Sequence, residues 1–245
     1  MPYAFKTMLP NYTPTPYHQF MKKTLTITQL FICFITFNLT AQDYFEGQID
    51  YTVAYESLNE NIPEKYLATL MGDAFTAYIK EDKYVMIYNS KGEQGWSKTV
   101  VRLDEGYSYF EYENSDTIIK SRLDQNTDKL IEIKHDTDHK KSILGEDCES
   151  IVLKYESTDP NYPFKITDGR HYFNPKYKLN PEQYKHYTSG FWNKYIDLSG
   201  SVSIRNEHVY KGFFKSVSEA VKIDKKDISD NIFTFDDYKT IILQD

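Results

Sequence analysis

Cysteine is scarce in this chain, with two residues, Cys33 and Cys148, in 245. Cys33 lies in an apolar stretch near the N-terminus, so only Cys148 belongs to the part that we expect to fold. A single cysteine cannot form an internal disulfide, which excludes a disulfide-stabilised scaffold. Stability must therefore come from a buried core, which a domain of about 200 residues can supply.

Catalytic and nucleotide-binding motifs are missing as well. The chain has no GxSxG, SxxK or HExxH sequence, and its ten glycines form no GxxxxGK[ST] loop. The paired carboxylates Glu111 and Glu113 share one face of a predicted strand, which we expect to be solvated. The sequence thus favours a protein without catalytic activity and without a cofactor. A hydrolase with an unrecognised site is the less favoured interpretation.

Basic residues are outnumbered, with 29 Lys and Arg against 36 Asp and Glu, a net charge of −7. Residues 1–42 contain three lysines and no acidic residue, so the remaining chain is more acidic still. An acidic surface disfavours nucleic acid and anionic membranes as partners.

Long hydrophobic runs are confined to the N-terminal region. Lys22 and Lys23 precede an apolar stretch at residues 25–37, and Ala41 provides a cleavage position. This order is typical of a secretory signal peptide, and the stretch is shorter than the ~20 residues that a membrane-spanning helix needs. We predict a start-site artefact or disordered extension at 1–20, a signal peptide at 21–42 and a single β-rich domain at 43–245. The protein would be exported to the periplasm or cell envelope, with no stable transmembrane segment after signal removal.

Apolar and polar residues alternate with a period of two along much of the chain. Short runs rich in Tyr, Phe, Val and Ile are separated by Gly, Asn and Asp turns. The predicted strands are 44–56, 75–80, 83–89, 96–104, 107–113, 117–124, 129–135, a run starting near residue 148, and 201–224. Helical spacing appears only at 62–75 and 180–198. The pattern predicts a mainly β fold, with one curved antiparallel sheet, a half-barrel or open barrel, wrapped over two short helices.

Aromatic residues make up 16% of the chain, well beyond what turns and surfaces need. A curved sheet over a helix leaves a concave apolar surface, where aromatic side chains can line a ligand cavity. The candidates for such a lining are Tyr51, Tyr55, Tyr109, Phe191 and Trp192. The alternative is that these rings simply fill the core.

Two shorter features raise questions of chemistry. His135, Asp136, Asp138 and His139 are candidate metal ligands, because two imidazoles and two carboxylates stand within five residues. The alternative is a polar hairpin turn, whose surrounding lysines would repel a cation.

Gly145 and Cys148 form the second such feature. Gly145 permits a tight turn or bulge at the start of a strand, and Cys148 follows as a small residue within that strand. A free cysteine in this position is expected to be a buried, inert hydrophobe.

The lysine-rich turn followed by ILGEDC at 143–148 and an alternating strand resembles a group of exported β-rich proteins of Bacteroidetes-type bacteria, related to the GLPGLI family. Many such proteins look like the lipoprotein-carrier superfold of LolA and LolB. The resemblance implies an open, curved antiparallel sheet wrapped over helices, and it brings no catalytic residues with it.

These observations predict an exported cell-envelope binding protein that holds a lipid or another hydrophobic ligand in the concave face of its sheet. The alternative is an interaction module of the envelope, whose exposed strands, such as 107–113, pair with another protein.

Overall fold

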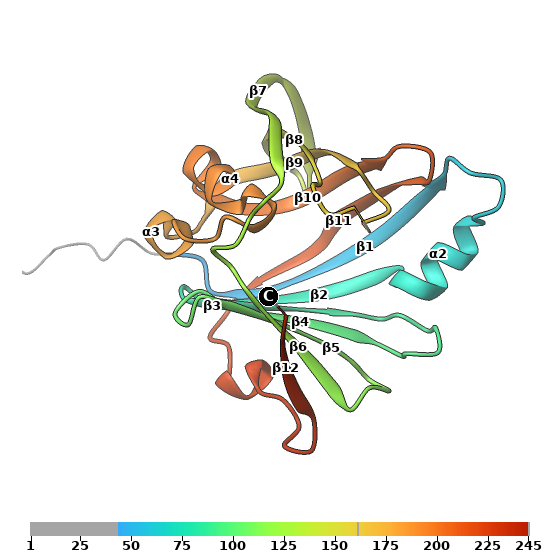
Figure 1. Ribbon diagram of the computed structural model, residues 1–245. Helices are drawn as coiled ribbons and strands as arrows, with labels where there is room; N and C mark the ends of the chain where they lie inside the picture. The colour runs from blue at the N-terminus through green and yellow to red at the C-terminus, as the bar shows by residue number, and fades with distance from the viewer. Residues whose placement is uncertain (1–43, 161, 245) are drawn as a thin grey trace, which may run out of the picture. The chain divides into compact units, whose positions relative to one another are not determined.

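The computed structural model describes residues 44–160 and 162–244. The predicted extension at 1–20 and the predicted signal peptide at 21–42 lie outside the described residues. In the described part the chain forms one twelve-stranded curved sheet accompanied by short helices (Figure 1). All neighbouring strands are antiparallel apart from one pair at an edge. The predicted mainly β class, with a single open curved sheet and few short helices, is confirmed.

The first six strands form an antiparallel meander, in which each strand pairs with the next one in sequence. They are β1 (Gly47–Ser57), β2 (Ala74–Ile79), β3 (Lys83–Tyr88), β4 (Ser97–Arg102), β5 (Tyr107–Tyr112) and β6 (Thr117–Arg122). The next five form a second meander. They are β7 (Lys129–Ile143), β8 (Glu146–Glu156), β9 (Ile166–Lys178), β10 (Ser201–Tyr210) and β11 (Phe214–Lys225).

The two meanders join where β11 pairs with β1, and a last strand, β12 (Thr240–Gln244), lies parallel to β6. The strand order is therefore β12-β6-β5-β4-β3-β2-β1-β11-β10-β9-β8-β7. In Figure 1 the two halves of the sheet diverge from the β1–β11 line. The edges of the described sheet are β12 and β7. The prediction that residues 107–113 offer an exposed strand is wrong, because β5 is paired on both sides.

The two predicted helical segments are shorter than the spacing indicated. Helix α2 (Glu64–Met71) follows Pro63 and ends at Gly72, whose φ of +88° stops a helix at little cost. The segment at 180–198 is divided into α3 (Pro181–Tyr184), the 3₁₀ turn η1 (Ser189–Phe191) and α4 (Trp192–Ser199). No helix within the described residues is long and apolar enough to cross a membrane.

The break between α3 and α4 has a tertiary cause. The backbone amides of Thr188 and Ser189 donate to the carbonyl of Leu123, at 2.9 and 3.1 Å, instead of continuing a helix. Gly190 and Phe191 then take left-handed φ values of +60°. The prediction of a continuous helix is wrong because a carbonyl in the loop after β6 accepts the hydrogen bonds of these amides.

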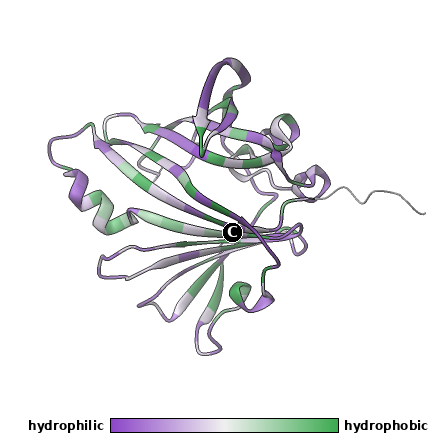
Figure 2. Ribbon diagram, turned by 180° about the vertical axis from the view of Figure 1, so that it is seen from behind, coloured by the Kyte–Doolittle hydropathy of each residue, from purple (hydrophilic) through white to green (hydrophobic). Residues whose placement is uncertain are grey.

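Packing divides into two hydrophobic clusters on opposite faces of the sheet. We call the face that carries Tyr51, Val53 and Tyr55 the cavity face, and its reverse the outer face. One cluster contains Ile49, Phe75 and the α4 residues Tyr195 and Ile196. On the outer face of β3 to β6, Val85, Val100, Tyr109 and Ile118 are covered by the chain after β11. The covering residues are Ile228, which precedes the 3₁₀ turn η2 (Asp230–Phe233), and Phe233, which ends it. In Figure 2 hydrophobic and hydrophilic residues alternate along several strands, as burial of alternate side chains requires.

The ILGEDC sequence forms the tip of the hairpin between β7 and β8, with Gly145 in its turn and Cys148 in β8. Leu144 and Gly145 connect Ile143 to its partner Glu146 with φ values of +53° and +78°. Two consecutive positive φ values describe a type I′ hairpin turn, for which glycine is favoured. Cys148 follows in β8 with no exposed surface, and burial raises the pKa of its thiol to about 11. The thiolate is therefore absent at neutral pH.

A buried ion cluster attaches the C-terminal segment to the outer face. The Glu111 carboxylate, 3% exposed, lies 3.6 Å from Lys98 Nζ and 3.0 Å from Lys239 Nζ. Lys239 Nζ also donates to Tyr112 O at 2.7 Å, and Lys98 Nζ to Thr234 O at 2.6 Å. The contact between Glu111 Oε2 and Lys239 is an ion pair without the alignment of a hydrogen bond. The prediction of a solvated Glu111 is wrong because residues after β11 cover it.

Replacing Glu111 with Gln should lower the free energy of unfolding by ~3 kcal/mol, because two buried ammonium groups would lose their counter-charge. Urea unfolding followed by circular dichroism measures this loss. The matched control is Glu113→Gln, an exposed position next to the same strand, which should change stability by less than about 0.5 kcal/mol. Equal losses in the two variants would contradict a stabilising role for the buried cluster.

Candidate functional site

A cavity of about 310 Å³ lies between the cavity face of the sheet and the helical segment that follows β9. Strands β1, β2, β3, β10 and β11 contribute one wall, and α3, α4 and their connection contribute the other. Met71 at the end of α2 also reaches the lining and is 37% exposed. None of the lining residues is Asp, Glu, Lys or Arg.

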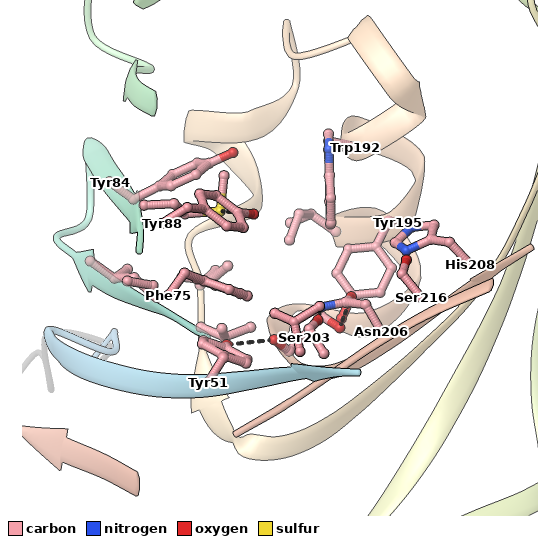
Figure 3. Close-up of a pocket in the computed structure, with 18 of the residues that line it drawn as sticks. Tyr51, Phe75, Tyr84, Tyr88, Trp192, Tyr195, Ser203, Asn206, His208 and Ser216 are labelled. Carbon is pink, nitrogen blue, oxygen red and sulfur yellow. Dashed lines mark hydrogen bonds between the residues drawn. The ribbon is translucent and has the colours of Figure 1, made fainter. Parts of the chain in front are cut away.

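An aromatic row crosses three strands on one side of this cavity. Strand register places Tyr51 opposite Phe75, and Phe75 opposite Tyr88. The rings of Tyr51 and Phe75 stack at 4.3 Å between centroids, and those of Phe75 and Tyr88 at 4.6 Å. The Tyr51 hydroxyl donates to Ser203 O at 2.8 Å, across to β10 (Figure 3). Cross-strand pairing thus produces a rigid aromatic surface from residues far apart in the chain.

The helical side adds more aromatic surface. Tyr184, Tyr187, Trp192 and Tyr195 line the cavity, and Tyr84 of β3 contacts Tyr187 with 3.3 Å between the hydroxyl oxygens. Tyr195 Oη is buried and has no well-aligned hydrogen bond to any described residue. Burial raises the pKa of Tyr195, and the nearby hydroxyls of Ser199 and Ser203 oppose this effect without cancelling it.

Opposite the aromatic row lies a group of uncharged polar residues, which we call the polar strip: Ser203, Asn206, His208, Ser216 and Ser218. Register places Asn206 opposite Ser218, and His208 opposite Ser216. Asn206 Oδ1 accepts from the buried His171 Nδ1 at 2.7 Å and from Ser203 Oγ at 2.6 Å, and Asn206 Nδ2 donates to Ser218 Oγ at 3.2 Å. In Figure 3 Asn206, His208 and Ser216 lie on the far side of the cavity from Tyr84 and Tyr88.

Every titratable group whose pKa is shifted at the cavity is held in its neutral form at pH 7. Burial raises the pKa of Tyr88 to about 12, and it raises those of Tyr51 and Tyr184 further. Burial and the neighbouring His171 lower the pKa of His208 to about 3. The centroids of the two imidazole rings are 5.2 Å apart. The site is thus an uncharged chamber with one aromatic side and one polar side.

A glycine makes room for the two imidazoles. Gly169 of β9 stands opposite His208. A Cβ at position 169 would lie 3.0 Å from His171 Nε2 and 3.4 Å from His208 Cδ2. Close packing of two rings that carry no formal charge is possible because this position has no side chain.

The five aromatic residues predicted to line a ligand cavity divide into two groups. Tyr51, Tyr55 and Trp192 line the cavity. Tyr109 does not: it lies on the outer face, with its ring 5.3 Å from that of Phe235. Phe191 does not either, and packs against Tyr155 at 5.5 Å. The prediction for Tyr109 is wrong because an alternating pattern does not specify which face of a strand packs against the helices.

The polar strip was missed by sequence reasoning. Its residues alternate within 201–224, as Asn206, His208, Ser216 and Ser218 on either side of one hairpin. Polar residues at every second position, on a strand whose other positions include Arg205 and Glu207, resemble a solvated strand. Only the covering helices convert this side into a cavity wall.

The four candidate metal ligands are not brought together. His135 Nε2 lies 2.7 Å from Glu149 Oε2, while His139 Nδ1 lies 2.8 Å from Asp136 Oδ2. Asp136 also accepts from Arg170 Nη1 at 2.8 Å, and this guanidinium holds the pKa of the Asp136 carboxyl well below its usual value. No group of three or more potential ligands occurs among the described residues. The expected turn is also wrong, since residues 136–139 belong to β7, whose register with β8 shifts between Asp136 and Lys141.

Comparison with known proteins yields distant structural similarities. No family model matches the chain, and no curated protein sequence is similar to it, so membership of the GLPGLI family stays a prediction. An uncharacterised conserved protein from Thermus thermophilus is similar with a TM-score of 0.42 and 9% identity, over 81% of this chain and 91% of that one. A LolA superfamily protein from Nitrosomonas europaea gives 0.35 and 12%, over 80% and 91%. A putative outer membrane lipoprotein-sorting protein domain from Vibrio parahaemolyticus gives 0.29 and 10%, over 76% and 89%.

The lowered pKa of His208 makes stability depend on pH. Unfolded histidine takes up a proton near pH 6.5, whereas folded His208 stays neutral until about pH 3, so the folded state loses stability as pH falls below 6.5. Between pH 7.5 and 5 the wild type should lose about 1–2 kcal/mol more than His208→Phe, the full linkage being reduced because the ring is only partly buried. Urea unfolding at both pH values measures the difference, and parallel losses would contradict a neutral His208.

Proposed function

We propose that this protein is a non-catalytic binding protein that holds an uncharged hydrophobic ligand between its sheet and the α3–α4 segment. The observation that carries the proposal is the cavity of about 310 Å³, whose lining is aromatic, aliphatic or neutral and polar. Ligand sites in proteins are commonly concave, mostly apolar and about 300–1,000 Å³ in volume. The volume corresponds to the lower end of this range and suits a single chain or a small ring system.

The energetics favour binding of hydrocarbon. Each methylene group that moves from water into such a cavity contributes ~0.8 kcal/mol. The walls are also ordered in advance, because the Tyr51 hydroxyl is bonded to Ser203 O and the Tyr55 hydroxyl to Gly72 O, both at 2.8 Å. A preformed wall reduces the entropy that is lost when a ligand binds.

The same residues are poorly suited to hydrolysis. His208 lies opposite Ser216, the arrangement from which a general base and a nucleophile would be built. With its pKa lowered to about 3, however, His208 is a weak base at neutral pH. No carboxylate lines the cavity to orient the imidazole, and no hydrogen bond joins His208 to Ser216 among the described residues. These features support binding over catalysis.

We place this function in the cell envelope, on the basis of the signal peptide that residues 21–42 resemble. Cleavage after Ala41 should produce a mature chain that begins at Gln42. Fractionation of the host cell followed by N-terminal sequencing of the protein checks this outcome. Recovery of an uncleaved chain from the cytoplasm would contradict export and would leave the binding proposal intact.

Ligand binding can be measured through the chain's two tryptophans. Trp96→Phe leaves Trp192, in the cavity lining, as the only tryptophan, and Trp192→Phe leaves Trp96 as the only one. A brominated alkane such as 1-bromodecane quenches nearby indole fluorescence and carries no charge. Saturable quenching is expected for the protein that retains Trp192 and not for the protein that retains Trp96.

A pair of substitutions on β1 tests whether the cavity is the site. In the Trp96→Phe background, Val53→Phe places extra volume in the cavity and should weaken 1-bromodecane binding about tenfold. The matched control, Ala54→Phe, adds the same ring on the exposed outer face of the same strand. Binding that is absent in the parent protein, or unaffected by Val53→Phe, would refute the proposal.

A further inference from the structure

The polar strip contains hydrogen-bonding groups that the protein does not use. Both ring nitrogens of His208 lack a hydrogen-bond partner among the described residues, although the ring meets that of His171 edge-on and stacks on that of Tyr210. The Ser216 hydroxyl, directly opposite on β11, has no such partner either within the described part of the chain. Both residues line the cavity. Polar groups that face a cavity without a protein partner can be satisfied by water or by a ligand.

The other residues of the polar strip already form hydrogen bonds within the protein. Asn206 uses its oxygen for His171 and Ser203, and its amide nitrogen for Ser218. This network holds the β10 and β11 side chains in place without consuming the capacity of His208 and Ser216. A neutral imidazole offers one N–H donor and one acceptor nitrogen, and a hydroxyl offers both functions on one oxygen. The pair therefore matches a group that both donates and accepts.

The electrostatics determine which kind of group this is. No Asp, Glu, Lys or Arg lines the cavity, so a charged group would be buried without a counter-charge. The imidazoles of His171 and His208 supply no compensation, because both have a pKa below the ordinary value and are neutral at pH 7. The charged residues of β9 and β10, such as Arg170, Arg205 and Glu207, alternate with the cavity positions and lie on the outer face.

The two sides of the cavity are spatially separate. Tyr84 and Tyr88 lie on one side, and Asn206, His208 and Ser216 lie on the other, with the α4 aromatic residues Trp192 and Tyr195 beside the strip (Figure 3). A ligand that spans the cavity must present a hydrocarbon part to the first side and a polar part to the second.

We propose that His208 and Ser216 form a subsite for an uncharged head group, of the hydroxyl class, on an amphipathic ligand whose hydrocarbon chain lies against the Tyr51–Phe75–Tyr88 row. This inference rests on the proposed function and specifies the ligand class: neutral hydroxyl-bearing amphiphiles bind, and carboxylates or ammonium compounds of the same chain length are rejected.

Competition against 1-bromodecane in the Trp96→Phe protein tests the head group at constant chain length. The competitors at pH 8 are 1-decanol, kept below its solubility limit, and decanoate and decyltrimethylammonium, kept below their micelle concentrations. Decanol should relieve the quenching at a concentration about tenfold lower than either ion, because burial of an unpaired charge is costly. If 1-bromodecane binds but the three competitors are equivalent, or an ion is preferred, the neutral subsite is overturned and the binding function stands. If neither 1-bromodecane nor any competitor binds, the proposed function itself fails.

Substitutions then locate the head group. His208→Phe and Ser216→Ala should each weaken decanol binding about fivefold relative to 1-bromodecane binding in the same variant, the effect of one lost hydrogen bond. Circular dichroism and urea unfolding check that the variants are folded. The matched control, Tyr88→Phe, removes a hydroxyl from the aromatic side and should leave the ratio of decanol to 1-bromodecane affinity unaltered. Loss of decanol competition in Tyr88→Phe alone, or no effect in the two strip variants, would overturn this placement.

Discussion

The pairing of β1 with β11 is the interaction on which the remaining structure depends. Each meander is assembled from antiparallel pairs of strands that are neighbours in sequence, and only this pairing joins the two into one sheet. It places Val53 beside Ser218 and Tyr55 beside Ser216. The polar strip of the second meander thereby becomes continuous with the aromatic row of the first. Without it the two sides of the cavity would belong to separate sheets.

The faces of this sheet differ in charge as well as in burial. The side chains of β10 and β11 that line the cavity are uncharged, whereas the outer face carries the Asp136–Arg170 and Arg205–Glu219 ion pairs. Because side chains alternate along a strand, a shift of register by one residue would exchange the two sets. Charged side chains would then occupy the cavity without partners. Burial of these unpaired charges would destabilise a shifted register. The neutral lining is therefore a consequence of the fold.

On the other half of the sheet, the outer face is covered by the chain itself. The segment after β11 lays Ile228 and Phe233 over Val85 and Val100, and Lys239 pairs with Glu111. A sheet buried on both faces is held more rigidly than one with a solvated side, which steadies the strands that carry the aromatic row. The cavity wall therefore depends on contacts made on the reverse of the same strands.

Local pattern alone was sufficient for most of the strands and for the mainly β class, because period-two alternation acts between near neighbours, but β9 and β12 were not among the predicted strands. Tertiary structure decided the rest. The carbonyl of Leu123 divided the second helical segment, and the covering residues after β11 buried Glu111 and placed Tyr109 on the outer face. The strip of Asn206, His208 and Ser216 became a cavity wall only through α4 above it. Sequence determines which residues alternate; which of the two faces meets a helix, the C-terminal segment or water depends on long-range packing that no local period encodes.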